Sequence, residues 1–178
     1  KFGNLPAVII ANLNDSEGNP TGISLIQQST SSSGNHGVGG ATLSGTPLDI
    51  SATETGHPVS ALQDLVYVSS NTSVTYWISE LDPTTMCQLT FFAGLNLQRQ
   101  KDSTQFSVSG ATSQPPVAFS PTNNSLTQTI EITPDSQGRI TIIFSGQGDT
   151  AHWNLLEIRL TRTPTLGTAV TLTGSTAQ

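Results

Sequence analysis

Residues 128–144, QTIEITPDSQGRITIIF, decide the fold class that this sequence predicts. Apolar and polar residues alternate on both sides of a short polar loop, PDSQG, at 134–138. The apolar positions are Ile130 and Ile132 before the loop, and Ile140, Ile142 and Phe144 after it. Period-two alternation places the apolar side chains of a strand on one face, so both runs are typical of half-buried β-strands. Two such strands joined by a glycine-bearing polar loop predict a β-hairpin.

Alternating segments of the same kind recur along the chain between clusters of Gly, Pro, Asn and Asp. They predict strands over 74–78, 87–93 and 106–108, and one continuous strand from His152 to Thr161. Strands at intervals of roughly ten residues favour an all-β fold, an antiparallel two-sheet β-sandwich or jelly roll with little or no helix. One helical turn, from Val59 to Leu65, is suggested by the spacing of apolar residues, and it is too short to be stable alone.

The predicted core consists of the apolar members of these alternating runs. It contains Tyr76, Ile78, Leu89, Phe91, Phe106, Val108, Ile130, Ile132, Ile140, Ile142, Leu156 and Ile158. The single cysteine, Cys87, is in phase with Leu89 and Phe91, which indicates a small buried side chain rather than a nucleophile. A single cysteine also excludes an internal disulfide and any metal site built from several cysteines.

The length of the chain, 178 residues, suits one well-packed core and is short for two. We therefore assign residues 1–163 to one jelly-roll domain and residues 164–178 to a C-terminal extension. After a break at Pro164, residues 169–174 alternate again, with two apolar side chains on one face. This segment is expected to form an extra strand that pairs along a sheet edge, either of its own domain or of a neighbouring copy.

Charged residues are scarce, at 10% of the chain, and their balance is acidic, with a formal net charge of −6. The 6 Lys and Arg residues do not form a run. This distribution argues against binding to nucleic acid, which requires clustered basic residues, and against docking on an anionic membrane. No stretch approaches the roughly 20 apolar residues that a membrane-spanning helix needs.

Signatures of catalysis are missing from the sequence. There is no Gly-x-Ser-x-Gly nucleophile elbow, and the three histidines, His36, His57 and His152, lie in unrelated turn-like contexts. Glu131 and Glu157 could face one groove, as the two carboxylates of a glycosidase do. Each of them, however, alternates with apolar residues in the way that a solvent-facing side chain does. We therefore expect a non-enzymatic domain without a cofactor.

One turn has the oxygen-rich composition of a calcium site. Residues 15–19, DSEGN, offer carboxylate and amide oxygens, but the glycine comes too early for the twelve-residue calcium-loop pattern. An ordinary acidic turn is the favoured interpretation, and structural calcium is the alternative.

Sugar recognition requires a flat aromatic face beneath the C–H side of the ring and hydrogen-bonding side chains at its hydroxyls. Trp77 is predicted to point away from the core face of its strand, and Trp153 follows a turn with polar neighbours. The loop at 96–102 is the densest polar and charged cluster in the chain. The candidate ligand-binding residues are Trp153, Asn154, His152, Trp77, Asn96, Arg99 and Asp102. For either tryptophan taken alone, packing in the core or on a sheet is the favoured interpretation.

A series of short motifs runs from one end of the predicted domain to the other. They are FGN at 2–4, LNDSEGNPTGISL at 13–25, ISELDP at 78–83, LTFFA at 89–93 and NLLEI at 154–158. In this order they resemble galactose-binding-like jelly-roll modules of secreted bacterial proteins. The resemblance spans roughly residues 2–161, and each motif is short and either apolar or turn-like.

The resemblance implies a jelly roll whose last core strand contains residues 154–158, with ligand-binding loops at one end of the sandwich. Such modules commonly accompany carbohydrate-active enzymes or sit on cell-surface proteins. The resemblance therefore implies a secreted or cell-surface location and a glycan or cell-surface polysaccharide as partner. Two features depart from the pattern: the opening strand is cut short at Lys1, and residues 164–178 continue past the point where similar modules end.

These observations lead to two functional hypotheses. The first is a non-catalytic extracellular carbohydrate-binding or adhesion module. The alternative is a structural subunit of an extracellular fibre or surface layer, which would self-associate by strand addition through residues 164–178. The position of this tail distinguishes an isolated module from a polymer.

Overall fold

All regular secondary structure in the described part of the chain is β-strand. The computed structural model describes residues 9–30, 36–40, 64–93, 103–119, 127–147 and 150–161. The strands are β1 Ile9–Ile10, β2 Ser24–Thr30, β3 His36–Gly40, β4 Asp64–Ser69, β5 Ser73–Ser79, β6 Met86–Phe92, β7 Thr104–Ser109, β8 Val117–Phe119, β9 Gln128–Ile132, β10 Ile140–Gly146, β11 Thr150–Trp153 and β12 Leu155–Thr161. This confirms the predicted all-β class.

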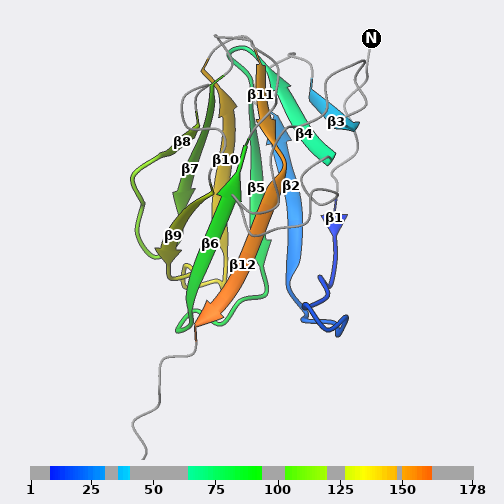
Figure 1. Cartoon of the computed structure of the whole chain (residues 1–178). Coiled ribbons are helices and arrows are strands. Elements are labelled where there is room, and N and C mark those ends of the chain that lie inside the picture. Colours follow the sequence, from blue (N-terminus) through cyan, green and yellow to red (C-terminus); the bar gives the residue numbers. More distant parts are fainter. Residues whose placement is uncertain are drawn as a thin grey trace, which may run out of the picture.

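The strands form one large sheet and two small ones, and every pairing is antiparallel. The large sheet has six strands in the order β1-β2-β5-β10-β7-β8, and the small sheets have the orders β11-β4-β3 and β12-β6-β9. Only Asn154 separates β11 from β12, so the two small sheets are joined end to end in the second layer. Figure 1 shows β6 and β12 lying across the front of the larger sheet. The architecture is a two-layer β-sandwich.

The predicted hairpin around residues 134–138 is wrong. Strand β9 pairs with β6 in a small sheet, whereas β10 pairs with β5 and β7 in the large sheet. The loop therefore crosses from one layer to the other. Its bend is closed by Asp135, whose carboxylate accepts the backbone N–H groups of Gln137 at 2.8 Å and Arg139 at 2.9 Å. Alternation identifies the buried face of a strand, but it does not specify the strand's partner.

The continuous strand expected from His152 to Thr161 is also wrong, because the chain breaks at Asn154 into β11 and β12. In the predicted helical turn at 59–65, Leu65 belongs to β4 instead, and residues 59–63 lie outside the described ranges. The expected strand at 169–174, with the whole extension 164–178, lies outside them too and stays a prediction.

The core lies between the two layers and matches the alternating apolar positions. Nine of the predicted core residues are less than 9% exposed, and Ile130, Leu156 and Ile158 are partly buried against them. The nine are Tyr76, Ile78, Leu89, Phe91, Phe106, Val108, Ile132, Ile140 and Ile142. Cys87 is buried as expected, and burial raises the pKa of its thiol, so the side chain acts as a small hydrophobe.

Within the described ranges, no helical segment has the length and hydrophobicity that a membrane crossing requires.

Replacing Phe91 by Ala is expected to lower the free energy of unfolding by about 3–5 kcal/mol, because a fully buried ring leaves a cavity. Urea denaturation followed by far-UV circular dichroism measures the change. Met86→Ala is the matched control in the same strand, since Met86 is 42% exposed, and its effect should stay within about 0.5 kcal/mol. If the Phe91 variant lost as little as the control, the assigned core would be incorrect.

Candidate ligand-binding face

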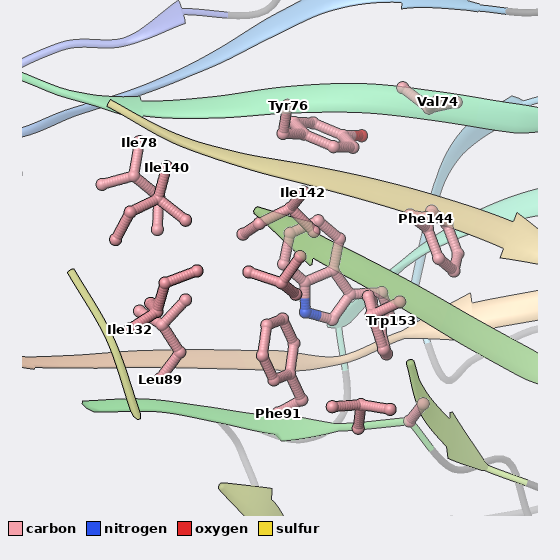
Figure 2. Packing of buried hydrophobic residues seen from close by; sticks show 14 of the residues in the cluster. Val74, Tyr76, Ile78, Leu89, Phe91, Ile132, Ile140, Ile142, Phe144 and Trp153 are labelled. Atoms are coloured by element: carbon pink, nitrogen blue, oxygen red, sulfur yellow. The ribbon is translucent and has the colours of Figure 1, made fainter. Parts of the chain in front are cut away.

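Trp153 is a core residue, in agreement with the packing interpretation, so its indole is not exposed as a sugar platform. It is 6% exposed and contacts four core rings. Figure 2 shows three of their residues, Tyr76, Phe91 and Phe144, around it. The ring centroid of Tyr76 is 5.1 Å away, that of Phe106 is 5.2 Å away and that of Phe144 is 5.7 Å away. The indole Nε1–H donates to the carbonyl of Leu155 at 2.9 Å. Core side chains therefore pack around this ring, and its N–H group already has a hydrogen-bond acceptor within the protein.

His152 joins the two layers. Its backbone N–H donates to the hydroxyl of Thr104 at 2.9 Å, and the same hydroxyl donates to the carbonyl of His152 at 3.1 Å. Both residues are buried, so this reciprocal bond fixes β11 against β7 away from water. Asn154, at the strand break, is partly buried, and its backbone N–H donates to the carbonyl of Phe92 at 3.1 Å. These contacts give both residues a structural role.

The other three sequence candidates, Asn96, Arg99 and Asp102, lie outside the described residues. Their part in ligand binding stays a prediction.

Trp77 lies on the outer face of the six-stranded sheet. Its strand, β5, buries Val74, Tyr76 and Ile78, so the alternating residue Trp77 points to the opposite side and is partly exposed. Because Tyr76 contacts Trp153 from the inner side, the sheet itself separates the two tryptophans. The structure therefore does not combine Trp77 and Trp153 in one site.

A guanidinium group completes the surface around Trp77. The Cζ atom of Arg139 lies 4.5 Å from the centroid of the Trp77 ring, which is a cation–π contact. Arg139 directly precedes β10, whose Thr141 lies opposite Trp77 on the outer face. On the other side of Trp77, Ile26 of β2 lies directly opposite it. The arrangement is an aromatic ring with a cation, a hydroxyl and an aliphatic group around it.

Sequence reasoning missed Arg139 for a definite reason. The alternation in β5 was enough to predict that Trp77 points outward. The contact between Trp77 and Arg139, however, requires β10 to pair with β5, and the predicted hairpin assigned β10 to β9 instead. The pairing of distant strands was the missing signal.

Glu80 adds a carboxylate at the end of β5. Its φ of 67° is in the left-handed region, where residues other than Gly are uncommon. In this conformation its Oε2 atom accepts a hydrogen bond from the Ser24 hydroxyl at 2.6 Å. Ser24 belongs to β2 and Arg139 leads into β10, so the bound carboxylate and the guanidinium lie on the two sides of β5. We call the outer-face group of Trp77, Arg139, Glu80 and Ser24 the Trp77 face.

A close contact between two loops positions the charged residues of the Trp77 face. The N–H of Leu81 donates to the carbonyl of Gly138 at 3.1 Å, and these residues directly adjoin Glu80 and Arg139. Gly138 has φ of +71°, and a Cβ atom there would overlap the carbonyl oxygen of Leu81. Only glycine satisfies both conditions.

The turn at 15–19 is closed by its own atoms. The Oδ1 atom of Asp15 accepts the backbone N–H groups of Glu17 and Asn19, each at 2.9 Å. The bond from the Asn19 backbone is the main cause of the lowered pKa of this exposed carboxyl. No group of three or more His, Cys, Asp or Glu side chains suited to a metal occurs in the described ranges. These contacts are those of an acidic turn.

Glu131 and Glu157 lie on one sheet face, in β9 and β12 on either side of β6. Glu131 lies opposite Gln88, and Glu157 lies opposite Thr90, two residues further along β6. The carboxylate of Glu157 forms an ion pair with Arg159 at 2.8 Å. The two carboxylates thus lie on a sheet surface, and one of them is held by a cation.

Comparisons with known proteins find similarity in structure alone. No family model matches the sequence, and no curated protein is significantly similar to it. The similar solved structures include TmCBM61 in complex with beta-1,4-galactotriose, at a TM-score of 0.35 and 14% identity, covering 71% of this chain and 88% of the other. They also include a family GH115 4-O-methyl-alpha-glucuronidase, at 0.41 and 9% identity, covering 60% of this chain and 15% of the other.

A third structure, that of the plant peptide RALF23 in complex with FER and LLG2, gives a TM-score of 0.47 at 11% identity and covers 89% of this chain and 55% of the matched one. The chain thus spans about half of that protein and a small part of the glucuronidase. Carbohydrate-binding modules and carbohydrate-active enzymes are among the structural neighbours.

The contact between Gly138 and Leu81 can be tested with two matched glycine variants. Gly18→Ala is expected to cost about 1–2 kcal/mol, the penalty of a left-handed backbone, because Gly18 has φ of +87° and open space around it. Gly138→Ala should cost a further 1–3 kcal/mol or so, because the added methyl group also overlaps Leu81. Chemical denaturation of both variants measures the difference, and equal losses would show that the loops do not approach each other this closely.

Proposed function

We propose that this chain is a non-catalytic carbohydrate-binding or adhesion module that acts outside the cell, and that its Trp77 face contacts the glycan. The observation that carries the proposal is the partly exposed indole of Trp77 on the outer face of the sheet, with a guanidinium 4.5 Å from its ring centroid. The ring of Trp153 is buried in the core. Trp77 is at the surface because side chains alternate along β5 and its neighbours Tyr76 and Ile78 face the core.

The groups on the Trp77 face have the chemistry that sugar binding requires. An indole offers an apolar surface to the C–H groups of a pyranose ring, at a small loss of conformational entropy. Arg139 supplies hydrogen-bond donors on one side of β5, and the carboxylate of Glu80 supplies acceptors on the other side. Thr141 adds a hydroxyl from the adjacent strand. Donors and acceptors around an aromatic ring fit a polyhydroxylated ligand.

The rigidity of this face also supports the proposal. Trp77 and Thr141 are held in the middle of a six-stranded sheet, and Glu80 and Arg139 are tied together by the contact between Leu81 and Gly138. A site on paired strands is already ordered before the ligand arrives, so binding loses little further conformational entropy.

The non-catalytic part of the proposal rests on the same geometry. The carboxylate of Glu80 at the Trp77 face is engaged with Ser24, and Glu131 and Glu157 lie on a different sheet. A glycosidase needs two carboxylates on opposite sides of the scissile bond. The extracellular location is proposed from the resemblance to secreted modules. The low charge and the Ser- and Thr-rich sequence agree with such a module.

Trp77→Ala is expected to abolish retention of the chain by its glycan, because the variant loses the apolar surface under the sugar ring. Stability should fall by no more than about 1–2 kcal/mol, since the indole is on the outer face. A glycan array followed by affinity electrophoresis measures retention, and thermal unfolding measures stability.

Met86→Ala is the control for this experiment, since it removes an exposed apolar side chain from the other layer and should leave retention unchanged. Undiminished retention of the Trp77 variant would exclude the Trp77 face as the site. Absence of any retained glycan for the native chain would refute the carbohydrate-binding proposal itself.

A further inference from the structure

The guanidinium of Arg139 is a cation without an acidic partner in the described part of the chain. The ion pair found there within 4.0 Å joins Arg159 to Glu157, in the other layer. The guanidinium of Arg139 donates no hydrogen bond to a described residue, and its contact is with the indole of Trp77. Its N–H donors therefore remain available to a molecule from solution.

The two carboxylates on the loops that adjoin Arg139, those of Asp135 and Glu80, are engaged elsewhere. Asp135 accepts the backbone N–H groups of Gln137 and Arg139 through one oxygen, which closes the loop before β10. Glu80 accepts the Ser24 hydroxyl at 2.6 Å, on the side of β5 that faces β2. Arg139 lies on the side that faces β10. The local carboxylates are thus held by other groups, and the charge of Arg139 is not neutralised by an ion pair with them.

We propose that the Trp77 face selects acidic glycans, and that Arg139 binds the anionic group of the sugar, a carboxylate or a sulfate. This inference rests on the proposed function and names the ligand class. A guanidinium presents its N–H donors in a planar fork that matches two oxygens of such a group. The guanidinium of Arg139 is already held over the Trp77 ring, so the sugar ring then lies against the part of the indole that remains exposed.

An anionic sugar is favoured over a neutral one because of the difference in hydrogen-bond strength. A bond between a guanidinium and an anionic oxygen is roughly twice as strong as one between neutral groups. The chain carries a net charge of −6, so its overall field repels polyanions. Any preference for an acidic glycan must therefore come from a local contact rather than from general attraction. Glu80, the other charge on the face, opposes the anion and lies across β5 from Arg139.

The test compares polygalacturonate, a sulfated galactan and neutral galactan as ligands for the full chain in isothermal titration calorimetry. The native chain should bind at least one acidic glycan about tenfold or more tightly than the neutral galactan, and Arg139→Gln should remove this preference. Arg139→Lys keeps the charge without the fork and should lose most of the preference too. Glu80→Gln removes the opposing charge and should strengthen acidic binding.

Arg159→Gln is the matched control, because it removes an exposed arginine from the other layer and should change nothing. Thermal melting establishes that each variant is folded. The acidic ligand that binds identifies the anionic group as carboxylate or sulfate. Equal binding of neutral and acidic glycans that Arg139→Gln leaves unchanged would overturn this inference, while loss on Trp77→Ala would still support the proposed function. Binding to none of a full glycan array would overturn both.

Discussion

The packing of Trp153 against the rings of both layers is the interaction on which the rest of the structure depends. The centroid of its ring lies 5.1 Å from that of Tyr76, 5.2 Å from that of Phe106 and 5.7 Å from that of Phe144, all in the large sheet. The ring of Phe91, in the layer of the small sheets, is 6.3 Å away. Interiors of proteins are close-packed, so this cluster fixes both the spacing and the relative position of the sheets. Burial in it raises the pKa of Tyr76 to about 12, since the ionised phenol would lose its hydration.

The same packing determines what the surface presents. Because Tyr76 must face inward to meet Trp153, its neighbour Trp77 must face outward. The crossing loops at the end of the sandwich then bring Arg139 and Glu80 to the strand that carries Trp77, through the contact of Gly138 with Leu81. The packing of the core therefore determines the geometry of the Trp77 face, and substitutions in the core should alter that geometry.

Alternation in the sequence was sufficient to predict the strands and most of the core, because burial of one face is a local property of a strand. It failed where the outcome depended on distant partners. The pairing of β10 with β5 is not encoded in residues 128–144 alone, so Arg139 could not be linked to Trp77. Alternation did not predict the burial of Trp153, because the break at Asn154 changes the pattern. In one continuous strand, Trp153 and Leu156 are three residues apart and would face opposite sides. In the structure both side chains reach the core.

The central claim is that the sheet divides the two tryptophans, one in the core and one at the ligand face. Because the chain has 2 tryptophans, Trp77→Phe and Trp153→Phe each leave a single indole whose fluorescence can be quenched with acrylamide. The account predicts that the indole of Trp153 emits at shorter wavelength and is weakly quenched, whereas Trp77 is quenched strongly and becomes protected when a glycan binds. Equal quenching of the two indoles, or protection of Trp153 alone, would contradict it.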